Sequence, residues 1–378
     1  MRRLYTKFSP YLQVFLITIL STIFLWLPFL LKATNWFGLQ ILDSNFHYIY
    51  RHYDGPFYLV VAKTFYNPHL IAHFGLESTL PPSYFAAHLP LYPILIVLFS
   101  FLLGYLKSMI AVNVLSTVFL ACAFYFVVTK FRISKNPLLL TTVFLFLPRF
   151  LVVRSIGAPE SLFMLFIVGS LYFFESKKYF LAGLLGALAT MTKSPGILLF
   201  VAYAATLCET FWKHKKISAQ SLWILLIPLG LLSVFYLYQI QYHDFFAYFH
   251  SGDNIHLVRP FAVFNAQKTW VGTHWLEDVI FYFVMYGLAI VYLFKSKYRS
   301  FFYFALILFA ATLCIEHRDI ARYSLPLWPL AAISFEKFFT SRAFLIVFVF
   351  ILIPAAYFYG WNFMVGNVMP ITLWKPFL

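Results

Sequence analysis

The stretch YLQVFLITILSTIFLWLPFLL, residues 11–31, decides the fold class of this chain. It contains no charged residue, and about 20 apolar residues are enough for a helix to cross the hydrocarbon core of a bilayer. A basic N-terminus precedes it, but the stretch is too long for the apolar region of a signal peptide and lacks a small-residue cleavage site. We therefore predict a membrane anchor that stays part of the protein.

Apolar runs of the same kind recur along the whole chain. They lie near residues 91–106, 109–129, 137–152, 160–175, 179–192, 195–212, 221–242, 277–294, 301–316, 323–339 and 343–363. With the first run they predict an all-α polytopic membrane protein of roughly 11–12 crossings, built as a single integral domain over 1–378. Pro and Gly interrupt several runs, and such breaks are tolerated only where protein or a wet cavity satisfies the freed backbone groups. We therefore expect a cavity inside the bundle.

The composition excludes a soluble domain. Of 378 residues, 62% are hydrophobic and 11% are charged, whereas soluble domains are about one quarter charged. Lys and Arg outnumber Asp and Glu by 28 to 13, but the cations stand in small groups between apolar runs, which indicates cytoplasmic loops and not a nucleic-acid surface. The three cysteines, Cys122, Cys208 and Cys314, lie within apolar runs, so we expect neither a disulfide framework nor a thiolate metal site.

The basic turns predict the orientation of the chain. If Arg2 and Arg3 are cytoplasmic, the two long polar loops, 32–90 and 243–276, are extracytoplasmic. One stretch disagrees, because the two runs between loop 32–90 and the basic turn 130–135 would place that turn outside. Either run 91–106 is interfacial or re-entrant, or the basic turn breaks the charge rule.

The first long loop concentrates polar residues just ahead of an amphipathic stretch. The candidates there are Asp43, Arg51, His52 and Asp54. The half-apolar segment 56–66 predicts an interfacial helix along the membrane surface. Asp54 would then lie at the level of the headgroups, where a lipid-linked substrate presents its phosphate. A plain Asp-Gly-Pro turn explains the same residues without any function.

Two single ionisable residues stand at the ends of apolar runs. Glu160 is a site candidate because acids at the edge of a membrane segment are rare, although an acid there also favours the N-terminus of a helix. Lys193 precedes a helix start that would favour an anion such as phosphate. It could equally be a loop lysine that extends to the membrane interface.

The most charged octet of the chain, EHRDIARY, spans residues 316–323. Its candidates for substrate contact are His317, Arg318, Arg322 and Tyr323, and two arginines suit bidentate binding of phosphate. The acids of the octet could instead pair with the arginines in a solvated turn. His88 could carry a proton or contact a headgroup, or it could be purely structural.

Several motifs are missing. The sequence contains no Walker A loop and no H-E-x-x-H pair, which excludes ATP hydrolysis by the first route and one class of metalloprotease. The histidine pairs of loop 32–90 have no clear carboxylate partner, so they make a weak metal site at best.

The order of the motifs resembles a known family. FHYIYRHYDGPFYLVVAKTFY (46–66) resembles the first-loop signature of the PIG-V-like branch of the GT-C glycosyltransferases, related to the enzyme that adds the second mannose of the GPI anchor. AAHLPLYPILI (86–96), which contains Tyr92, is similar to that family's FFPLYPLL segment. APESLFMLFIVGSLYFF (158–174), LAGLLGALATMTKSPGILL (181–199) and RYSLPLWPL (322–330) resemble its TESLF, AGLLAGLASLTRSTGLLL and RYLLPAFPL segments. The match touches five places in the expected order.

The chain departs from the family pattern at a few positions. Tyr53 replaces the usual Trp before Asp54, and Phe65-Tyr66 ends without the family's Gly. His88-Leu89 stands where Phe-Phe is common, and Lys193 takes the place of an Arg.

The resemblance implies an inverting transferase of a prokaryotic plasma membrane or an ER membrane. Its donor would be a polyprenyl- or dolichyl-phosphate sugar, usually mannose, and its acceptor a glycan or glycolipid on the extracytoplasmic or lumenal side. Asp54 would be the general base, and Arg322, Arg318 and Lys193 would hold the lipid phosphate. Glu160 with His88 would position the acceptor or the base.

We count Arg51, His52, Tyr92, His317 and Tyr323 among the candidates for substrate contact. No cofactor is required, because Arg and Lys can neutralise a phosphate leaving group, although Asp43 with Asp54 could bind a divalent cation.

Two other classes remain open. A transporter or flippase of lipid-linked sugars would use similar broken helices but would keep ionisable groups at the middle of the membrane. Here nearly all of them lie at segment ends on one side, which favours the enzyme. A noncatalytic assembly subunit would remain possible if Asp54, Glu160 and Arg322 lay far apart.

Overall fold

The computed structural model describes residues 2–42, 45–74, 80–252, 257–265, 267, 276–368, 371 and 374–378. Regular structure in these ranges is almost entirely helical, with one short antiparallel ribbon of β1 (Asn35–Trp36) and β2 (Leu39–Gln40). The chain forms two compact units. Unit 1 contains Met1–Leu165, Val234–Gly252 and Lys337–Leu378, and unit 2 contains Phe166–Ser233 and Asp253–Glu336.

Unit 1 holds the N-terminal helices, the first long loop and the C-terminal helices. Its elements are α1 (Arg2–Leu30), α2 (His47–Tyr50), α3 (Gly55–Thr64), α4 (Pro68–Ala72), η1 (Pro82–Ala87), α5 (Leu91–Leu103), α6 (Tyr105–Lys130), α7 (Pro137–Leu145), α8 (Pro148–Val153), α13 (Ala247–His250), α18 (Glu336–Phe339), α19 (Arg342–Val347), η6 (Phe348–Leu352), α20 (Ile353–Gly366) and η7 (Lys375–Phe377). Three helices have residues in both units: α9 (Glu160–Glu175), α12 (Leu226–Tyr242) and α18, whose first residue, Glu336, belongs to unit 2.

Unit 2 holds the middle of the chain. Its elements are α10 (Tyr179–Thr192), η2 (Ser194–Ile197), α11 (Leu198–His214), η3 (Ala219–Leu225), η4 (Ala262–Phe264), α14 (Glu277–Phe294), α15 (Arg299–Leu313), α16 (Ile320–Tyr323), η5 (Leu325–Leu327) and α17 (Trp328–Ser334).

The helices confirm the predicted polytopic membrane fold. Within the described residues, six stretches are long and apolar enough to cross a membrane: Ser9–Leu30, Tyr105–Lys130, Ser194–His214, Ala219–Tyr242, Glu277–Phe294 and Arg342–Gly366. Leu91–Leu103, Tyr179–Thr192, Arg299–Leu313 and Leu325–Ser334 are shorter apolar helices. The run predicted at 137–152 is divided into α7 and α8, because Pro148 begins a new helix.

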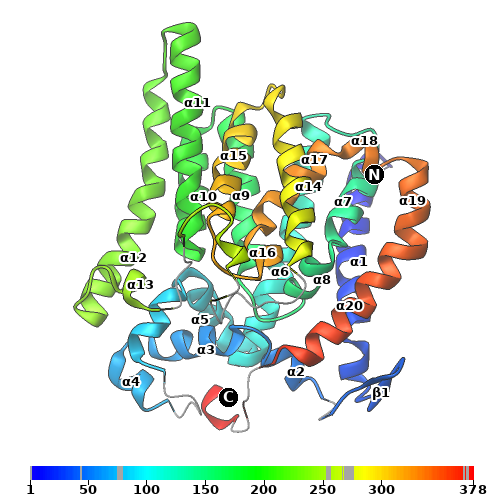
Figure 1. The fold of residues 1–378 in the computed structure, drawn as a ribbon, viewed down its shortest axis with the longest axis vertical. Coiled ribbons are helices and arrows are strands. Elements are labelled where there is room, and N and C mark those ends of the chain that lie inside the picture. Colours follow the sequence, from blue (N-terminus) through cyan, green and yellow to red (C-terminus); the bar gives the residue numbers. More distant parts are fainter. Residues whose placement is uncertain are drawn as a thin grey trace. The chain divides into compact units, whose positions relative to one another are not determined.

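The N-terminal helix α1 is fixed within unit 1 by α6, α7 and α20 (Figure 1). Arg154, which directly follows α8, is completely buried and donates to Ser21 Oγ at 2.8 Å and Thr22 Oγ1 at 2.7 Å on α1. Two aromatic side chains of α20 reach the same helix, because Tyr357 OH donates to Ser21 O at 3.0 Å and Trp361 Nε1 donates to Leu25 O at 3.1 Å. These polar contacts fix α1 to α20 and to the segment after α8, in addition to its apolar packing.

The helix predicted in the first loop is α3, and it is enclosed by protein. Every residue of α3 except Lys63 is buried, and the helix packs against α5 and α6. The segment therefore does not present the exposed polar face that we expected from an amphipathic surface helix.

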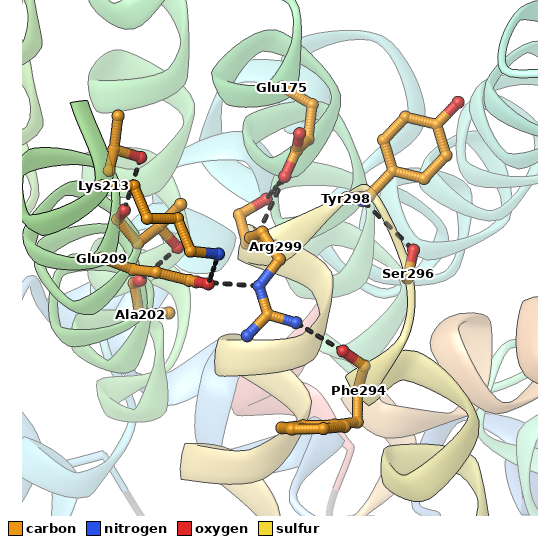
Figure 2. Close-up of polar contacts among 11 residues, drawn as sticks. Glu175, Ala202, Glu209, Lys213, Phe294, Ser296, Tyr298 and Arg299 are labelled. Atoms are coloured by element: carbon orange, nitrogen blue, oxygen red, sulfur yellow. Dashed lines mark hydrogen bonds and ion pairs between the residues drawn. The ribbon is translucent and has the colours of Figure 1, made fainter.

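Unit 2 is tied together at one end of its helices by a polar network (Figure 2). Glu209 on α11 accepts from Lys213 Nζ at 2.5 Å and from Arg299 Nε at 2.8 Å. The adjacent Ser300 donates its backbone N–H and its hydroxyl to Glu175 Oε1 at 2.8 and 2.7 Å. The first turn of α15 is thereby joined to the last turns of α9 and α11, and α15 also lies beside α14 (Figure 1).

Candidate active site

Asp54 lies at a tight turn that starts α3. Tyr53 adopts a left-handed backbone with φ of 50°, which turns the chain immediately before Asp54. Asp54 is the residue that precedes the helix, its carbonyl accepts from Tyr58 N at 3.2 Å, and Pro56 stands in the first turn, where its missing N–H costs nothing. The predicted Asp-Gly-Pro turn is present, and it places Asp54 directly before the N-terminus of α3.

The Asp54 turn packs directly on the segment that leads to Glu160. A Cβ added to Gly55 would lie 3.1 Å from Gly157 O and 3.3 Å from Met109 Sδ. At this distance the Gly157 carbonyl would have to shift by a few tenths of an ångström to admit a side chain at position 55. Glu160 follows Gly157 by three residues, is 2% exposed and begins α9. The two predicted carboxylates therefore belong to neighbouring segments of unit 1.

The segment before Glu160 is held by one buried side chain of α6. Asn113 Nδ2 donates to Val153 O at 2.8 Å and to Ile156 O at 2.6 Å. One turn further along α6, Thr117 Oγ1 donates to Ser161 Oγ at 2.7 Å. Sequence reasoning missed Asn113, although a lone amide within an apolar helix is the signal that could have identified it.

Tyr92 and His88 complete this side of unit 1. Burial raises the pKa of Tyr92 and the neighbouring negative charge of Glu160 raises it further, so the tyrosine lies within electrostatic range of that carboxylate. The Tyr92 hydroxyl donates to Met109 O at 2.7 Å. The ring of Tyr58 lies 5.1 Å from that of Tyr92 and 4.9 Å from that of His88. Four of the predicted residues thus lie on neighbouring segments of unit 1: Asp54, His88, Tyr92 and Glu160.

Two buried tyrosines hold the backbone around His88. The Tyr66 hydroxyl donates to His88 O at 2.6 Å, and the Tyr238 hydroxyl donates to Ala86 O at 2.8 Å. Both tyrosines are completely buried, and burial raises the pKa of Tyr66 well above its ordinary value. The Tyr66 hydroxyl therefore stays neutral and keeps donating at any physiological pH.

Arg51 and His52 lie beside the Asp54 turn. The guanidinium of Arg51 is 4.6 Å from the centre of the Tyr48 ring. His52 is completely buried and forms an isolated antiparallel bridge with Val368. Both residues therefore lie in unit 1, on the same loop as Asp54.

The C-terminal segment crosses this first loop. The rings of Trp374 and His47 stack at 4.6 Å, and those of Phe377 and Phe74 are 5.3 Å apart. Lys63 Nζ donates to Pro376 O at 2.8 Å and to Leu378 O at 2.6 Å, and burial lowers the pKa of this lysine. We call the described residues of this segment, 367, 368, 371 and 374–378, the C-terminal strap.

Arg149 is a cation that sequence reasoning did not single out. Its Nη1 donates to the Tyr53 hydroxyl. Its guanidinium lies 4.1 Å from the centre of the Phe363 ring and 5.9 Å from that of Tyr359. Arg149 escaped notice because it was counted inside the apolar run 137–152, where a single arginine is itself the signal of a functional position.

The remaining candidates belong to unit 2. The rings of His317 and Tyr323 meet edge to face at 5.2 Å, and Asp319 N donates to His317 Nδ1 at 3.0 Å. Arg322 is buried in α16, whereas Arg318 is exposed. Lys193 is half-buried and ends α10 in an extended conformation. The structure brings His317 and Tyr323 together, and the convergence of this set with Asp54 stays a prediction.

The prediction of a possible cation site involves a residue that is not described. Asp43 lies outside the described residues. In the described part of the chain, no three His, Cys, Asp or Glu side chains gather as metal ligands.

Comparison with known proteins shows the fold. No family model and no curated protein matches this sequence. A solved structure with a similar fold is the crystal structure of ArnT from Cupriavidus metallidurans bound to undecaprenyl phosphate, with a TM-score of 0.55 and 12% sequence identity over 92% of this chain and 75% of ArnT. ArnT is a GT-C polytopic membrane protein. The predicted all-α, GT-C type membrane fold is thereby confirmed.

Proposed function

We propose that this chain is a GT-C glycosyltransferase that moves a monosaccharide from a polyprenyl- or dolichyl-phosphate donor to an acceptor. The observation that carries the proposal is the packing of the Asp54 turn on the segment of Glu160 through Gly55 and Gly157. The fold shared with ArnT, which was solved with undecaprenyl phosphate bound, supports a lipid phosphate as part of the donor. Mannose as the sugar and a glycan or glycolipid as the acceptor follow from the sequence resemblance.

The reaction assigns Asp54 the role of general base. The acceptor hydroxyl oxygen bonds to the anomeric carbon, and the bond from that carbon to the phosphate oxygen breaks. The hydroxyl proton passes to the Asp54 carboxylate, and the polyprenyl phosphate leaves with the electron pair. A single displacement of this kind inverts the anomeric carbon. Glu160 and His88, on the neighbouring segments, orient the acceptor or the base.

The proposed site faces the extracytoplasmic or lumenal side. Helix α5 has 13 residues and extends about 20 Å, which is less than the ~30 Å of the hydrocarbon core. If α5 does not cross, the turn 130–135 moves to the same side as the other basic turns, including Lys177-Lys178 and 213–216. All of these are then cytoplasmic, as the charge rule requires. The Asp54 turn then lies on the opposite side.

Turnover by Asp54→Asn tests the proposal. Membranes containing the full chain are supplied with polyprenyl-phosphate mannose and a panel of glycolipid acceptors, and new glycoside is measured. General bases contribute about 10²–10⁴-fold, so Asp54→Asn should lose about that much turnover while still binding the donor. The matched control is Asp278→Asn, which makes the same change at an exposed residue of α14.

Two results would contradict the proposal. Wild-type turnover in Asp54→Asn would remove Asp54 as the base. Movement of the donor across sealed vesicles without any new glycoside would indicate a flippase.

A further inference from the structure

Arg149 is held in an aromatic setting and is bonded to Tyr53, the residue before the candidate base. Its guanidinium lies over the face of Phe363 at 4.1 Å, with Tyr359 at 5.9 Å, and its Nη1 donates to the Tyr53 hydroxyl. The Tyr53 ring is itself 5.6 Å from Phe363. These contacts come from α8, the Asp54 turn and α20, all within unit 1. A guanidinium held by ring faces keeps a fixed direction for its planar N–H fork.

The position of Arg149 suits a leaving phosphate. In a single displacement the base and the leaving group lie on opposite sides of one sugar carbon, so the phosphate must be bound within the reach of one sugar from Asp54. Arg149 bonds to Tyr53, the residue directly before Asp54. Arginine presents two parallel N–H groups that match two phosphate oxygens.

Other cations of unit 1 have contacts that direct them elsewhere. Arg154 is completely buried and bonded to α1. Lys63 donates to carbonyl oxygens of the C-terminal strap. The Arg51 guanidinium lies over the Tyr48 ring.

We propose that Arg149 is a binding residue for the phosphate of the polyprenyl-phosphate donor. This inference rests on the proposed function and adds a binding residue that lies within the same unit as Asp54. Arg149 stabilises the negative charge that develops on the phosphate as its bond to the sugar breaks. Tyr53, Tyr359 and Phe363 hold the guanidinium in place before the donor arrives.

Binding of polyprenyl phosphate without a sugar tests Arg149 separately from transfer. Purified full-length chain is titrated with polyprenyl phosphate and with the uncharged polyprenol, and binding is measured by native mass spectrometry. Arg149→Gln should weaken polyprenyl phosphate binding about tenfold or more, the loss expected for a charge-assisted contact. Its affinity for polyprenol should not change. Arg149→Lys keeps the charge but loses the planar pair of N–H groups, so its affinity for polyprenyl phosphate should lie between those of the wild type and Arg149→Gln.

Three further variants serve as controls. Arg132→Gln removes an exposed arginine of a basic turn and should bind as the wild type does. Asp54→Asn should retain polyprenyl phosphate binding. Tyr53→Phe removes the bond to Nη1 but keeps the ring, so it should weaken binding less than Arg149→Gln does.

The outcomes separate the two proposals. The assignment of Arg149 would be rejected if Arg149→Gln bound polyprenyl phosphate as tightly as the wild type does. It would also be rejected if the variant lost affinity for polyprenol by the same factor as for polyprenyl phosphate. In both cases the proposed function would stand. If the wild-type chain bound no polyprenyl phosphate, both would be rejected. A selective loss of phosphate affinity supports both.

Discussion

The backbone of Gly55 passes the carbonyl oxygen of Gly157 so closely that a Cβ at position 55 would lie 3.1 Å from that oxygen. Gly55 follows Asp54, and Gly157 stands three residues before Glu160. The separation of the two carboxylates is therefore set by backbone contact between two small residues. The Met109 side chain packs against both glycines, so a single added methyl group at either position would disturb this geometry.

We expect Gly157→Ala to reduce both stability and sugar transfer. Its Cβ would lie 2.4 Å from Met109 Sδ and 2.8 Å from Met109 Cγ, and overpacking of this kind costs about 1–3 kcal/mol. Met109→Ala removes those atoms, so the double variant should lose less than the sum of the single losses. Thermal unfolding and turnover of all four proteins measure this coupling.

Gly366→Ala is the matched control for that cycle. No atom lies within 4 Å of a Cβ built at Gly366, so this substitution should have little effect. Strictly additive losses at positions 157 and 109 would contradict the close contact.

Asn113→Ala should destabilise the segment before Glu160. It leaves Val153 O and Ile156 O without their side-chain donor, at a cost of about 1–3 kcal/mol for each buried group that loses its bond. Asn113→Asp should cost more, because it points a carboxylate oxygen at two carbonyl oxygens. Unfolding temperature in detergent measures both, with Asn136→Ala in an exposed turn as the control. Equal unfolding temperatures for Asn113→Ala and Asn136→Ala would refute the assigned role.

Arg154→Met should be tolerated better than the loss of its hydroxyl partners. Replacing a buried charge by an apolar side chain of similar size is often neutral or stabilising, whereas removing its partners leaves the charge buried. Ser21 and Thr22 also donate to Ile17 O and Thr18 O, so they stay bonded without the arginine. The double change Ser21→Ala with Thr22→Val should therefore cost about 2 kcal/mol or more.

Adding Arg154→Met to that double variant should recover most of the loss. Thr142→Val is the control, because Thr142 makes the same local bond, to Leu138 O, on α7. Unfolding in detergent compares the five proteins. If Arg154→Met lost more stability than the double variant, the buried arginine itself would stabilise the protein, which would contradict this prediction.

The membrane fold could be predicted from the sequence because apolar length is a local property. Residues 11–31 and 109–129 identified two spanning helices, and Glu160 was placed at the start of the helix that it begins. The sequence also indicated that run 91–106 is unusual and that Pro148 interrupts its run, but it did not give the bounds of α5, α7 and α8. These bounds depend on where Pro148 and Gly104 interrupt runs that remain apolar on either side.

The candidate site was only partly predictable. The sequence indicated some site residues because they interrupt apolar runs or lie at the ends of such runs. These are Asp54, Glu160, His88 and Tyr92, which lie on neighbouring segments of unit 1. Asn113 and Arg149 lie inside apolar runs, and hydropathy does not indicate which face of a helix meets another part of the chain. Their partners, Ile156 and Phe363, are known only once the helices are packed.

The C-terminal strap has a consequence for how the protein is made. The backbone bridge from His52 to Val368 and the stack of Trp374 on His47 join the first loop to residues that are synthesised after α20. While the intervening helices are being inserted, the nascent chain carries an Asp54 turn that lacks this support. The contacts that support the Asp54 turn are therefore completed only after the helices from α3 to α20 have been synthesised.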